Sequence, residues 1–174
     1  MDYHRHLDDE LDSLRDKVLL MGGETEAALE RAMHSLVERD SQLAQEVLEN
    51  DDKVDTLEVE IDRQCIEIIA LRQPRSWCRL CVPRIRLRQP AARDLRFVIS
   101  VAKMAPVLER VADHACNIAR AAIDLNNEPE LTAVADLRKM SEHALNMLRA
   151  ALDAFTSSDA IAAREVIKRD EKIK

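Results

Sequence analysis

The stretch from Pro90 to Asn127 carries apolar residues at three- and four-residue steps along its length. Because an α-helix turns once every 3.6 residues, this spacing gathers the apolar residues on one face of a long helix. Pro90 fits the first turn of such a helix, where its missing N–H has no partner to lose. A helix with an apolar face needs other helices to cover it. The predicted face consists of Leu95, Ile99, Ala102, Ala105, Leu108, Ala112, Ala115, Ile118, Ala122 and Leu125.

Similar patterns precede and follow this stretch. Asp40 has the side chain and the position of a helix N-cap. Gly22 and Gly23 interrupt another helical pattern, which predicts a bend or a close helix contact there, because glycine is unfavourable inside helices. Helical spacing predicts helices over residues 5–37, 40–71 and 131–155, and a last helix that begins after the cap at residues 157–159.

The composition agrees with an all-α fold. Aromatic residues make up 2% of the chain and it has two glycines, whereas β proteins are richer in both. The formal charge of −7 argues against non-specific binding to nucleic acid. No stretch approaches the roughly 20 apolar residues that span a bilayer, and the acidic start does not resemble a secretory signal. Two of the four cysteines lie within amphipathic patterns, so we expect a reducing, cytoplasmic location.

The chain contains an internal repeat. A shift of 119 positions places Asp40 on Asp159 and continues with further identities, such as Val47 on Val166. The repeating unit is three antiparallel helices, which predicts a complete bundle over residues 1–128 and an incomplete second bundle, with two helices, over residues 129–174. An incomplete bundle leaves an apolar face uncovered, and such a face favours dimerisation. The side chains expected to be exposed on it are Leu137, Met140, Leu148 and Ile167.

Residues 75–90 differ from the rest of the chain. They contain five arginines, the single tryptophan and two cysteines, but no acidic residue. The same Leu-Arg-Gln-Pro tetrapeptide brackets them at both ends, and a structureless connection of this length is unusual in a compact bundle. We interpret the segment as an inserted loop. Cys78 and Cys81 have the spacing of half a zinc ribbon, but the chain has no second half.

Two pairs of acidic residues form the candidate site. Asp51 and Asp55 are four residues apart in one predicted helix, and Glu109 and Asp113 are four apart in another. Each pair leaves one side of its helix, so antiparallel packing would bring the two pairs to a similar depth. Carboxylate oxygens suit a divalent or iron-type metal ion. The pattern therefore predicts a metal site, although solvated helix faces also carry such acidic pairs.

The segment Leu108–Ala119 resembles the signature helix of the PhoU family of phosphate-uptake regulators. Residues 72–74, when joined to residues 92–96, resemble a second family segment, and residues 51–57 resemble a third. One departure is Ala112, where the family usually has glycine. The resemblance implies PhoU-like antiparallel helical bundles and an acidic E(D)xxxD metal motif on each bundle. Carried over by position, the first bundle's motif falls on Asp51, Asp55, Glu109 and Asp113.

The resemblance implies an adaptor and no enzyme. Members of the family restrain the phosphate-starvation response, link the phosphate ABC transporter, through its ATPase subunit, to a phosphate-sensing histidine kinase, and commonly form homodimers. Such a protein meets the membrane only through its partners. Two alternatives remain open: a metal-dependent enzyme that uses the same carboxylate cluster, and a plain helical scaffold without metal. In the second bundle, Lys174 replaces the second acid of the motif, which predicts that this bundle lacks a metal site.

Overall fold

The computed structural model describes residues 2–70, 92–129 and 134–170, and every regular element in these ranges is a helix. The all-α fold predicted from the sequence is therefore confirmed for this part of the chain. The proposed insertion at residues 75–90 lies outside the described residues. The helices are α1 (Asp2–Glu38), α2 (Ser41–Glu49), α3 (Asp52–Ala70), α4 (Ala92–Leu125), α5 (Val134–Thr156) and α6 (Ala160–Asp170).

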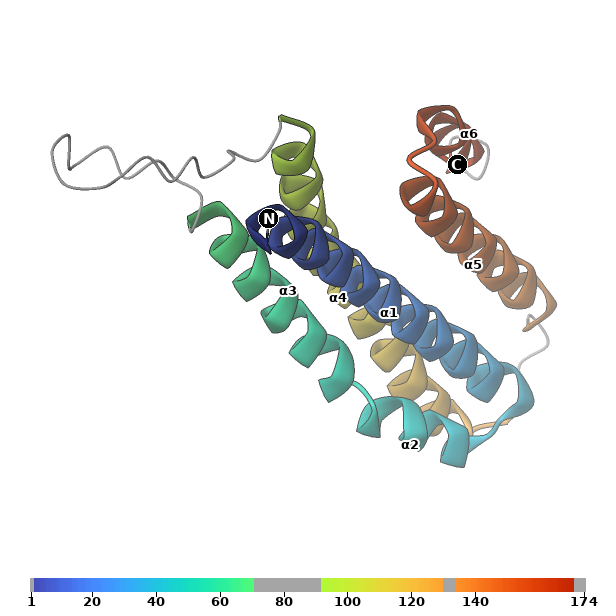
Figure 1. The fold of residues 1–174 in the computed structure, drawn as a ribbon. Coiled ribbons are helices and arrows are strands. Elements are labelled where there is room, and N and C mark those ends of the chain that lie inside the picture. Colours follow the sequence, from blue (N-terminus) through green and yellow to red (C-terminus); the bar gives the residue numbers. More distant parts are fainter. Residues whose placement is uncertain (1, 71–91, 130–133, 171–174) are drawn as a thin grey trace, which may run out of the picture.

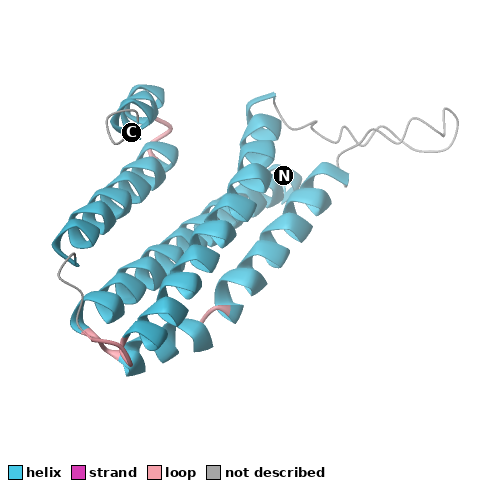
Figure 2. Ribbon diagram, turned by 180° about the vertical axis from the view of Figure 1, so that it is seen from behind, coloured by secondary structure: helices cyan, strands magenta, loops and turns pink. Residues whose placement is uncertain are grey.

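Helices α1, α3 and α4 run alongside one another as the first bundle, and α2 continues the line of α3 (Figure 1). Helix α5 packs against α1, and α6 folds back at the end of α5. Figure 2 shows the same arrangement from behind, with the described turns at the helix ends. In the described ranges, no helix combines the length and the apolar character needed to cross a membrane.

The second rod of the bundle is broken, so the prediction of one continuous helix over residues 40–71 was wrong. Asn50 ends α2: its backbone N–H bonds to the carbonyls of Glu46 and Val47, and its side-chain amide donates to the Glu46 carbonyl at 2.6 Å. Asparagine side chains compete in this way with continued helix. Helix α3 then starts with Asp52 and Asp55 in its first turn, where the helix dipole favours negative charge. The break leaves Asp51 between the two helices.

Buried apolar side chains fill the space between the three rods in two clusters. Each large side chain that is fully buried contributes about 1.5–3 kcal/mol. The first cluster joins α1, α3 and α4 through Leu7, Leu14, Val18, Met21, Val54, Ile61, Cys65, Ile68, Val98, Val101, Ala105, Leu108 and Ala112. The second, rich in alanine, joins α1, α2, α4 and α5 through Leu29, Ala32, Ala44, Val47, Ala115, Cys116, Ala119, Ala122 and Leu145.

The predicted apolar face of α4 was wrong at its beginning. Leu95 and Ile99 are 39% and 41% exposed, whereas Val98 and Val101 are buried. Both sets have helical spacing, so periodicity alone cannot choose between them. The packing against α1 and α3 selects the valines.

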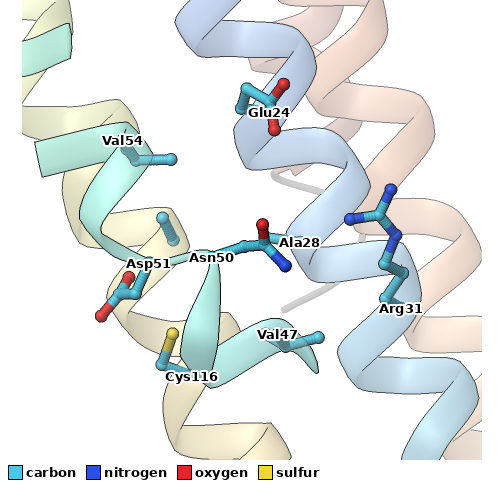
Figure 3. A pocket seen from close by; sticks show the side chains of 9 residues that line it. Glu24, Ala28, Arg31, Val47, Asn50, Asp51, Val54 and Cys116 are labelled. Atoms are coloured by element: carbon cyan, nitrogen blue, oxygen red, sulfur yellow. The ribbon is translucent and has the colours of Figure 1, made fainter. Parts of the chain in front are cut away.

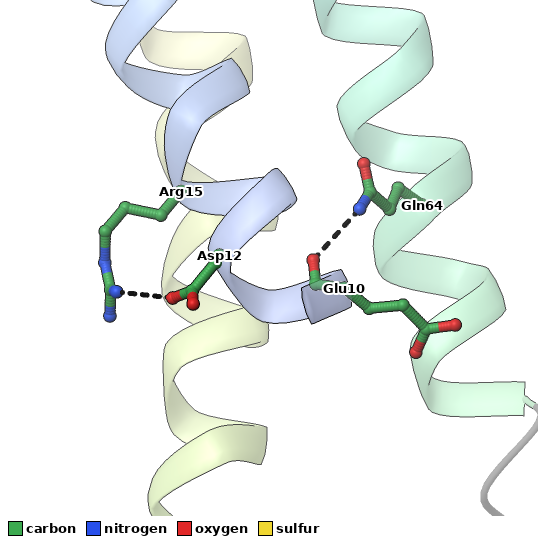
Figure 4. A network of polar contacts seen from close by, with 4 residues as sticks. All are labelled: Glu10, Asp12, Arg15 and Gln64. Atoms are coloured by element: carbon green, nitrogen blue, oxygen red, sulfur yellow. Dashed lines mark hydrogen bonds and ion pairs between the residues drawn. The ribbon is translucent and has the colours of Figure 1, made fainter. Parts of the chain in front are cut away.

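Polar contacts join the rods at both ends of the bundle. The Gln64 side-chain amide on α3 donates to the backbone carbonyl of Glu10 on α1 at 3.0 Å (Figure 4). At the opposite end, one nitrogen of the Arg39 guanidinium donates to the carbonyls of Leu125 at 3.1 Å and Asn126 at 2.9 Å, and also to that of Glu128. The last carbonyls of a helix have no partner within the helix. Arg39 thus caps the C-terminal end of α4.

The repeat seen in the sequence is present in the structure. Asp40 accepts hydrogen bonds from the first backbone N–H groups of α2, and Asp159 accepts the equivalent bonds at the start of α6. The residue before each cap has positive φ, at 57° for Arg39 and 54° for Ser158. The turn between α5 and α6 therefore repeats the geometry of the turn between α1 and α2.

Helix α5 is joined to the first bundle by apolar, aromatic and ionic contacts. Phe155 stacks on Phe97 of α4 with ring centroids 5.7 Å apart, and the Arg15 guanidinium lies 5.0 Å from the Phe97 ring. Arg149 pairs with Glu26 and Glu30 of α1, and Arg138 pairs with Glu38 at 2.7 Å. Leu148 also packs against the first cluster, so the prediction of an exposed Leu148 was wrong. The other three side chains predicted to be exposed are exposed: Leu137, Met140 and Ile167.

Candidate functional site

Helices α3 and α4 pack antiparallel, as the sequence argument for the site requires. Near the end of α3, the Cys65 thiol lies 3.7 Å from the backbone carbonyl of Val98, close to the start of α4. Near the start of α3, Asp51 lines the same small cavity as Cys116, which is further along α4. The residue numbers rise on one helix as they fall on the other. This register brings the two acidic pairs to the same level of the bundle.

Two of the four predicted carboxylates, Asp55 and Glu109, have pKa values that are shifted by their surroundings. The pKa of Asp55 is raised, first by partial burial and then by the negative charges of Asp51, Asp113 and Asp52. Like charges that lie close together disfavour the ionised form. Asp113 belongs to the other helix, so the repulsion extends across the α3–α4 contact.

Glu109, on α4, has negatively charged neighbours like those of Asp55. Its pKa is raised by partial burial, by the charges of Asp113, Glu58 and Asp55, and by a hydrogen bond with the Asp113 side chain. The structure thus places Glu58 of α3 near Glu109. Further along α3, burial and then the negative charge of Asp62 raise the pKa of the Cys65 thiol to about 11.

The sequence argument did not include Cys116 in the site. This thiol is 1% exposed, and burial together with its hydrogen bond to Asp51 raises its pKa to about 12. A protonated thiol is a weak hydrogen-bond donor and a poor nucleophile. Its position three residues after Asp113 places it on the same side of α4, which is the signal that could have identified it. Cys116 is therefore a protonated neighbour of the acidic pairs and not a candidate nucleophile.

A small cavity lies beside this acidic face, where α2 and α3 meet α1 and α4. Its volume is about 10 Å³, close to the minimum that holds one water molecule. In Figure 3, the Asn50 amide points toward α1, whereas Asp51 points away from α1 on the side of Cys116. The cavity is too small to hold an organic substrate.

Carboxylate oxygens suit the metal predicted from the sequence, but their present arrangement does not form a finished site. Within residues 2–70, 92–129 and 134–170, no three His, Cys, Asp or Glu side chains are placed to hold a metal ion. The metal site at Asp51, Asp55, Glu109 and Asp113 therefore stays a prediction. The prediction that the second bundle lacks a metal site depends on Lys174, which lies outside the described residues.

The fold and this face define a class: a helical-bundle protein with a repeated helix pair and an acidic surface across two packed helices. A model of the PhoU domain matches residues 18–82, 78–122 and 137–174 of the chain. These ranges cover well over half of its length. The chain belongs to the PhoU family.

Individual relatives and a solved structure agree with this assignment. A phosphate-specific transport system accessory protein PhoU homolog from Aquifex aeolicus is 34% identical over 94% of the chain and 67% of the relative. A homolog of the same name from Pseudomonas aeruginosa is 40% identical over 70% of the chain. The match covers only 43% of that relative's length. The crystal structure of PhoU from Pseudomonas aeruginosa superposes with a TM-score of 0.83 at 36% identity, over 95% of the chain and 72% of that protein.

Proposed function

We propose that this chain is a cytoplasmic regulator of phosphate uptake that restrains the phosphate-starvation response. The observation that carries the proposal is the match to the Aquifex aeolicus accessory protein over 94% of the chain. That relative is named for phosphate-specific transport, and the chain spans about two thirds of it. The PhoU domain match over three separate ranges supports the same role.

In this role the protein acts by binding other proteins, without catalysis. Its partners are the ATPase subunit of the phosphate ABC transporter and the phosphate-sensing histidine kinase, and it works as a homodimer. The exposed carboxylates Asp55 and Asp113 give the first bundle a surface on which a partner with basic residues could dock. The small volume of the adjoining cavity also favours a docking surface over a substrate site.

The test is a deletion of the gene in its own host, followed by growth in phosphate-rich medium. Transcription of phosphate-starvation genes should rise in the deletion strain and return to the basal level when the 174-residue chain is expressed from a plasmid. A strain that carries the empty plasmid is the control. Unchanged transcription in the deletion strain would contradict the proposal, and failure of the plasmid alone would show that this length of chain is not sufficient.

We propose, second, that the carboxylates Asp51, Asp55, Glu109 and Asp113 take up a divalent or iron-type metal ion. The raised pKa values of Asp55 and Glu109 support this, because a bound cation would relieve the repulsion that raises them. The test is elemental analysis of the purified protein after incubation with Mn²⁺, Mg²⁺ or Fe²⁺ and desalting. Wild-type protein should retain metal, and the Glu109→Gln and Asp113→Asn variants should not.

The same preparation separates this proposal from the two alternatives. A metal-dependent enzyme would hydrolyse or oxidise a test substrate, such as a phosphoester, and lose this activity in Asp113→Asn. A plain scaffold would retain no metal in either form. Lys103→Gln, an exposed change on α4 that leaves the carboxylates intact, is the matched control and should bind metal like the wild type.

A further inference from the structure

Helices α3 and α4 each have a second face, outside the core, that is mainly apolar at one end and acidic at the other. Its residues follow one another at steps of three or four positions, so they stay on one side of their helix. On α4 the face consists of Leu95, Ile99, Ala102, Pro106, Glu109 and Asp113. On α3 it consists of Asp55, Val59, Asp62 and Ile66.

Because α3 and α4 pack antiparallel, the two helices present one joint surface, which we call the α3–α4 face. The Cys65 thiol on α3 lies 3.7 Å from the Val98 carbonyl on α4, and Ile66 and Ile99 directly follow these residues. The apolar ends are therefore at one level of the bundle. The acidic ends are together at the other level, where charges on each helix raise the pKa of a carboxyl group on the other.

The apolar half of the α3–α4 face is open to solvent. Val59 is 67% exposed and Ile66 is 57% exposed, and Leu95 and Ile99 are exposed as well. Helix α1 packs against the other side of the α3–α4 pair (Figure 1), where it meets Gln64 of α3. The face contains no residue of α5 or α6. Exposed apolar side chains that lie together commonly mark sites of interaction with other proteins.

The acidic half of the face is not neutralised by ion pairs. Among the described residues, no Lys or Arg side chain forms an ion pair with Asp55, Asp62, Glu109 or Asp113. The neighbouring charges that raise the pKa of Asp55 are all negative. A positively charged partner can therefore bind here without displacing an ion pair, whereas an anionic membrane surface would be repelled.

We propose that the α3–α4 face binds an amphipathic helix of a partner protein. One end of that helix presents apolar side chains to Ile66, Leu95 and Ile99, and the other end presents Lys or Arg side chains to the carboxylates. This occupant complements the face in both properties, because the face is half apolar and half acidic. The proposal rests on the proposed function, since it specifies the surface through which the regulator meets its partners.

A helix suits this face better than an extended segment does. Two antiparallel helices form a groove between their ridges, and a third helix packs into it, as α1 does on the other side of the pair. Along α4, Leu95 and Asp113 are about 27 Å apart, at about 1.5 Å per residue. A partner helix of about 18 residues covers this length. Its apolar anchors recur at three- and four-residue steps, as in other helices that bind in grooves.

The first test is the binding of a synthetic helix to the purified 174-residue protein, measured by fluorescence anisotropy with a chelator present. The probe is a labelled peptide of this length, with leucines on one face of its first half and lysines on the same face of its second half. Ile66→Glu and Ile99→Glu should each weaken binding by about tenfold. Leu20→Glu is the matched control and should bind like the wild type, because Leu20 on α1 is 55% exposed and outside the face.

The acidic half is tested with the same peptide. Asp62→Asn should also weaken binding, and Asp62 is not one of the predicted metal ligands, so its effect does not depend on the metal site. A peptide with glutamates in place of the lysines should not bind the wild type. Higher salt should weaken the binding of the lysine peptide, because ions screen exposed charges.

The second test uses the deletion strain of the starvation-gene assay. Plasmids that carry Ile66→Glu or Ile99→Glu should fail to restore basal transcription, whereas Leu20→Glu should restore it as the wild-type plasmid does. Circular dichroism of the purified variants checks their helix content, and immunoblots check that the cells contain equal amounts of each protein.

The outcomes separate this face from the rest of the proposed function. Equal binding of the lysine peptide by the wild type and both isoleucine variants would overturn the proposal. Variants that restore basal transcription would also overturn it, and they would leave the regulatory role intact. Unchanged transcription in the deletion strain would contradict the proposed function, and the peptide measurement then decides on the face alone.

Two further results would assign the face to another occupant. A shift in solution mass from dimer to monomer in Ile66→Glu would assign it to a second copy of the chain. Peptide binding that requires deletion of residues 75–90 would assign it to that segment of the same chain. Either result would overturn a separate partner helix.

Discussion

Gly22 of α1 lies directly against Leu152 of α5: a Cβ atom placed on Gly22 would be 2.8 Å from the Leu152 Cδ1 atom. Gly23, its neighbour, has no such atom within 4 Å. The two glycines therefore have different roles, although the sequence presents them as one feature. Gly22 allows α5 to approach α1 closely, and Gly23 is free of this constraint.

The two glycines provide a matched pair of substitutions. Gly23→Ala should stabilise the protein by up to about 1 kcal/mol, because alanine is the better residue inside a helix. Gly22→Ala gains the same helix preference but must displace the Leu152 side chain, so its net effect should be smaller. Urea unfolding of both variants measures the difference. Equal stabilisation by the two substitutions would show that α5 does not pack on Gly22.

The stacked rings of Phe97 and Phe155 should couple α4 energetically to α5. We expect Phe97→Leu and Phe155→Leu each to destabilise the protein, and the double variant to lose less than the sum. The coupling free energy should be about 0.5–1.5 kcal/mol, as for other aromatic pairs. A double-mutant cycle from chemical unfolding measures it, and additive losses would contradict the contact.

Arg39 should stabilise the bundle through the end of α4. Arg39→Ala removes the charged donor from the carbonyls of Leu125 and Asn126, and we expect a loss of about 1.5–3 kcal/mol, which is typical of hydrogen bonds to charged groups. Arg39→Lys keeps the positive charge near the helix C-terminus and should lose less. Thermal unfolding of both variants measures the effect. An equal loss in Arg39→Lys would assign the effect to the shape of the guanidinium and not to its charge.

Helix positions followed from the sequence wherever a local signal marks them. Asp40 and Asp159 act as caps in the structure, and the glycine pair indicated the close helix contact at Gly22. The break at Asn50 was not predicted from the sequence, because Val47 and Val54, on either side of it, are seven residues apart and so keep the helical phase. The burial of Leu148 was not predicted, because α5 is apolar on two faces. Only tertiary packing decides which face meets the first bundle.

The spacing of acidic residues in the sequence identified the two acidic pairs of the candidate site, but it did not predict which residues surround them. The position of Glu58 beside Glu109 depends on the antiparallel register of α3 and α4, which local spacing does not determine. The position of Asp51 beside Cys116 depends on the break that leaves Asp51 between two helices. Periodicity predicts which side of a helix a residue takes, and packing decides which residue it meets.

The raised pKa values of Asp55 and Glu109 predict how stability depends on pH in the metal-free protein. A carboxyl group whose pKa is higher in the folded than in the unfolded state binds its proton more tightly when folded. It therefore favours folding below its ordinary pKa of about 4, and this contribution is lost as the pH rises through the raised value. Asp55→Asn and Glu109→Gln each remove a carboxylate whose negative charge lowers the stability of the folded state at higher pH. Both variants should therefore be more stable than the wild type at pH 7, with the difference shrinking toward pH 4.

Thermal unfolding between pH 4 and pH 7, with a chelator present, measures this difference. Asp9→Asn on α1 is the matched control, because it removes an exposed carboxylate far along the chain from the cluster and should follow the wild-type curve. Addition of Mn²⁺ at pH 7 should then raise the unfolding temperature of the wild type more than that of Glu109→Gln, because only the wild type keeps all four carboxylates. Parallel curves for wild type and both variants across the pH range would show that these carboxylates do not repel one another. A cation would then have no repulsion to relieve, and the metal proposal would lose its electrostatic support.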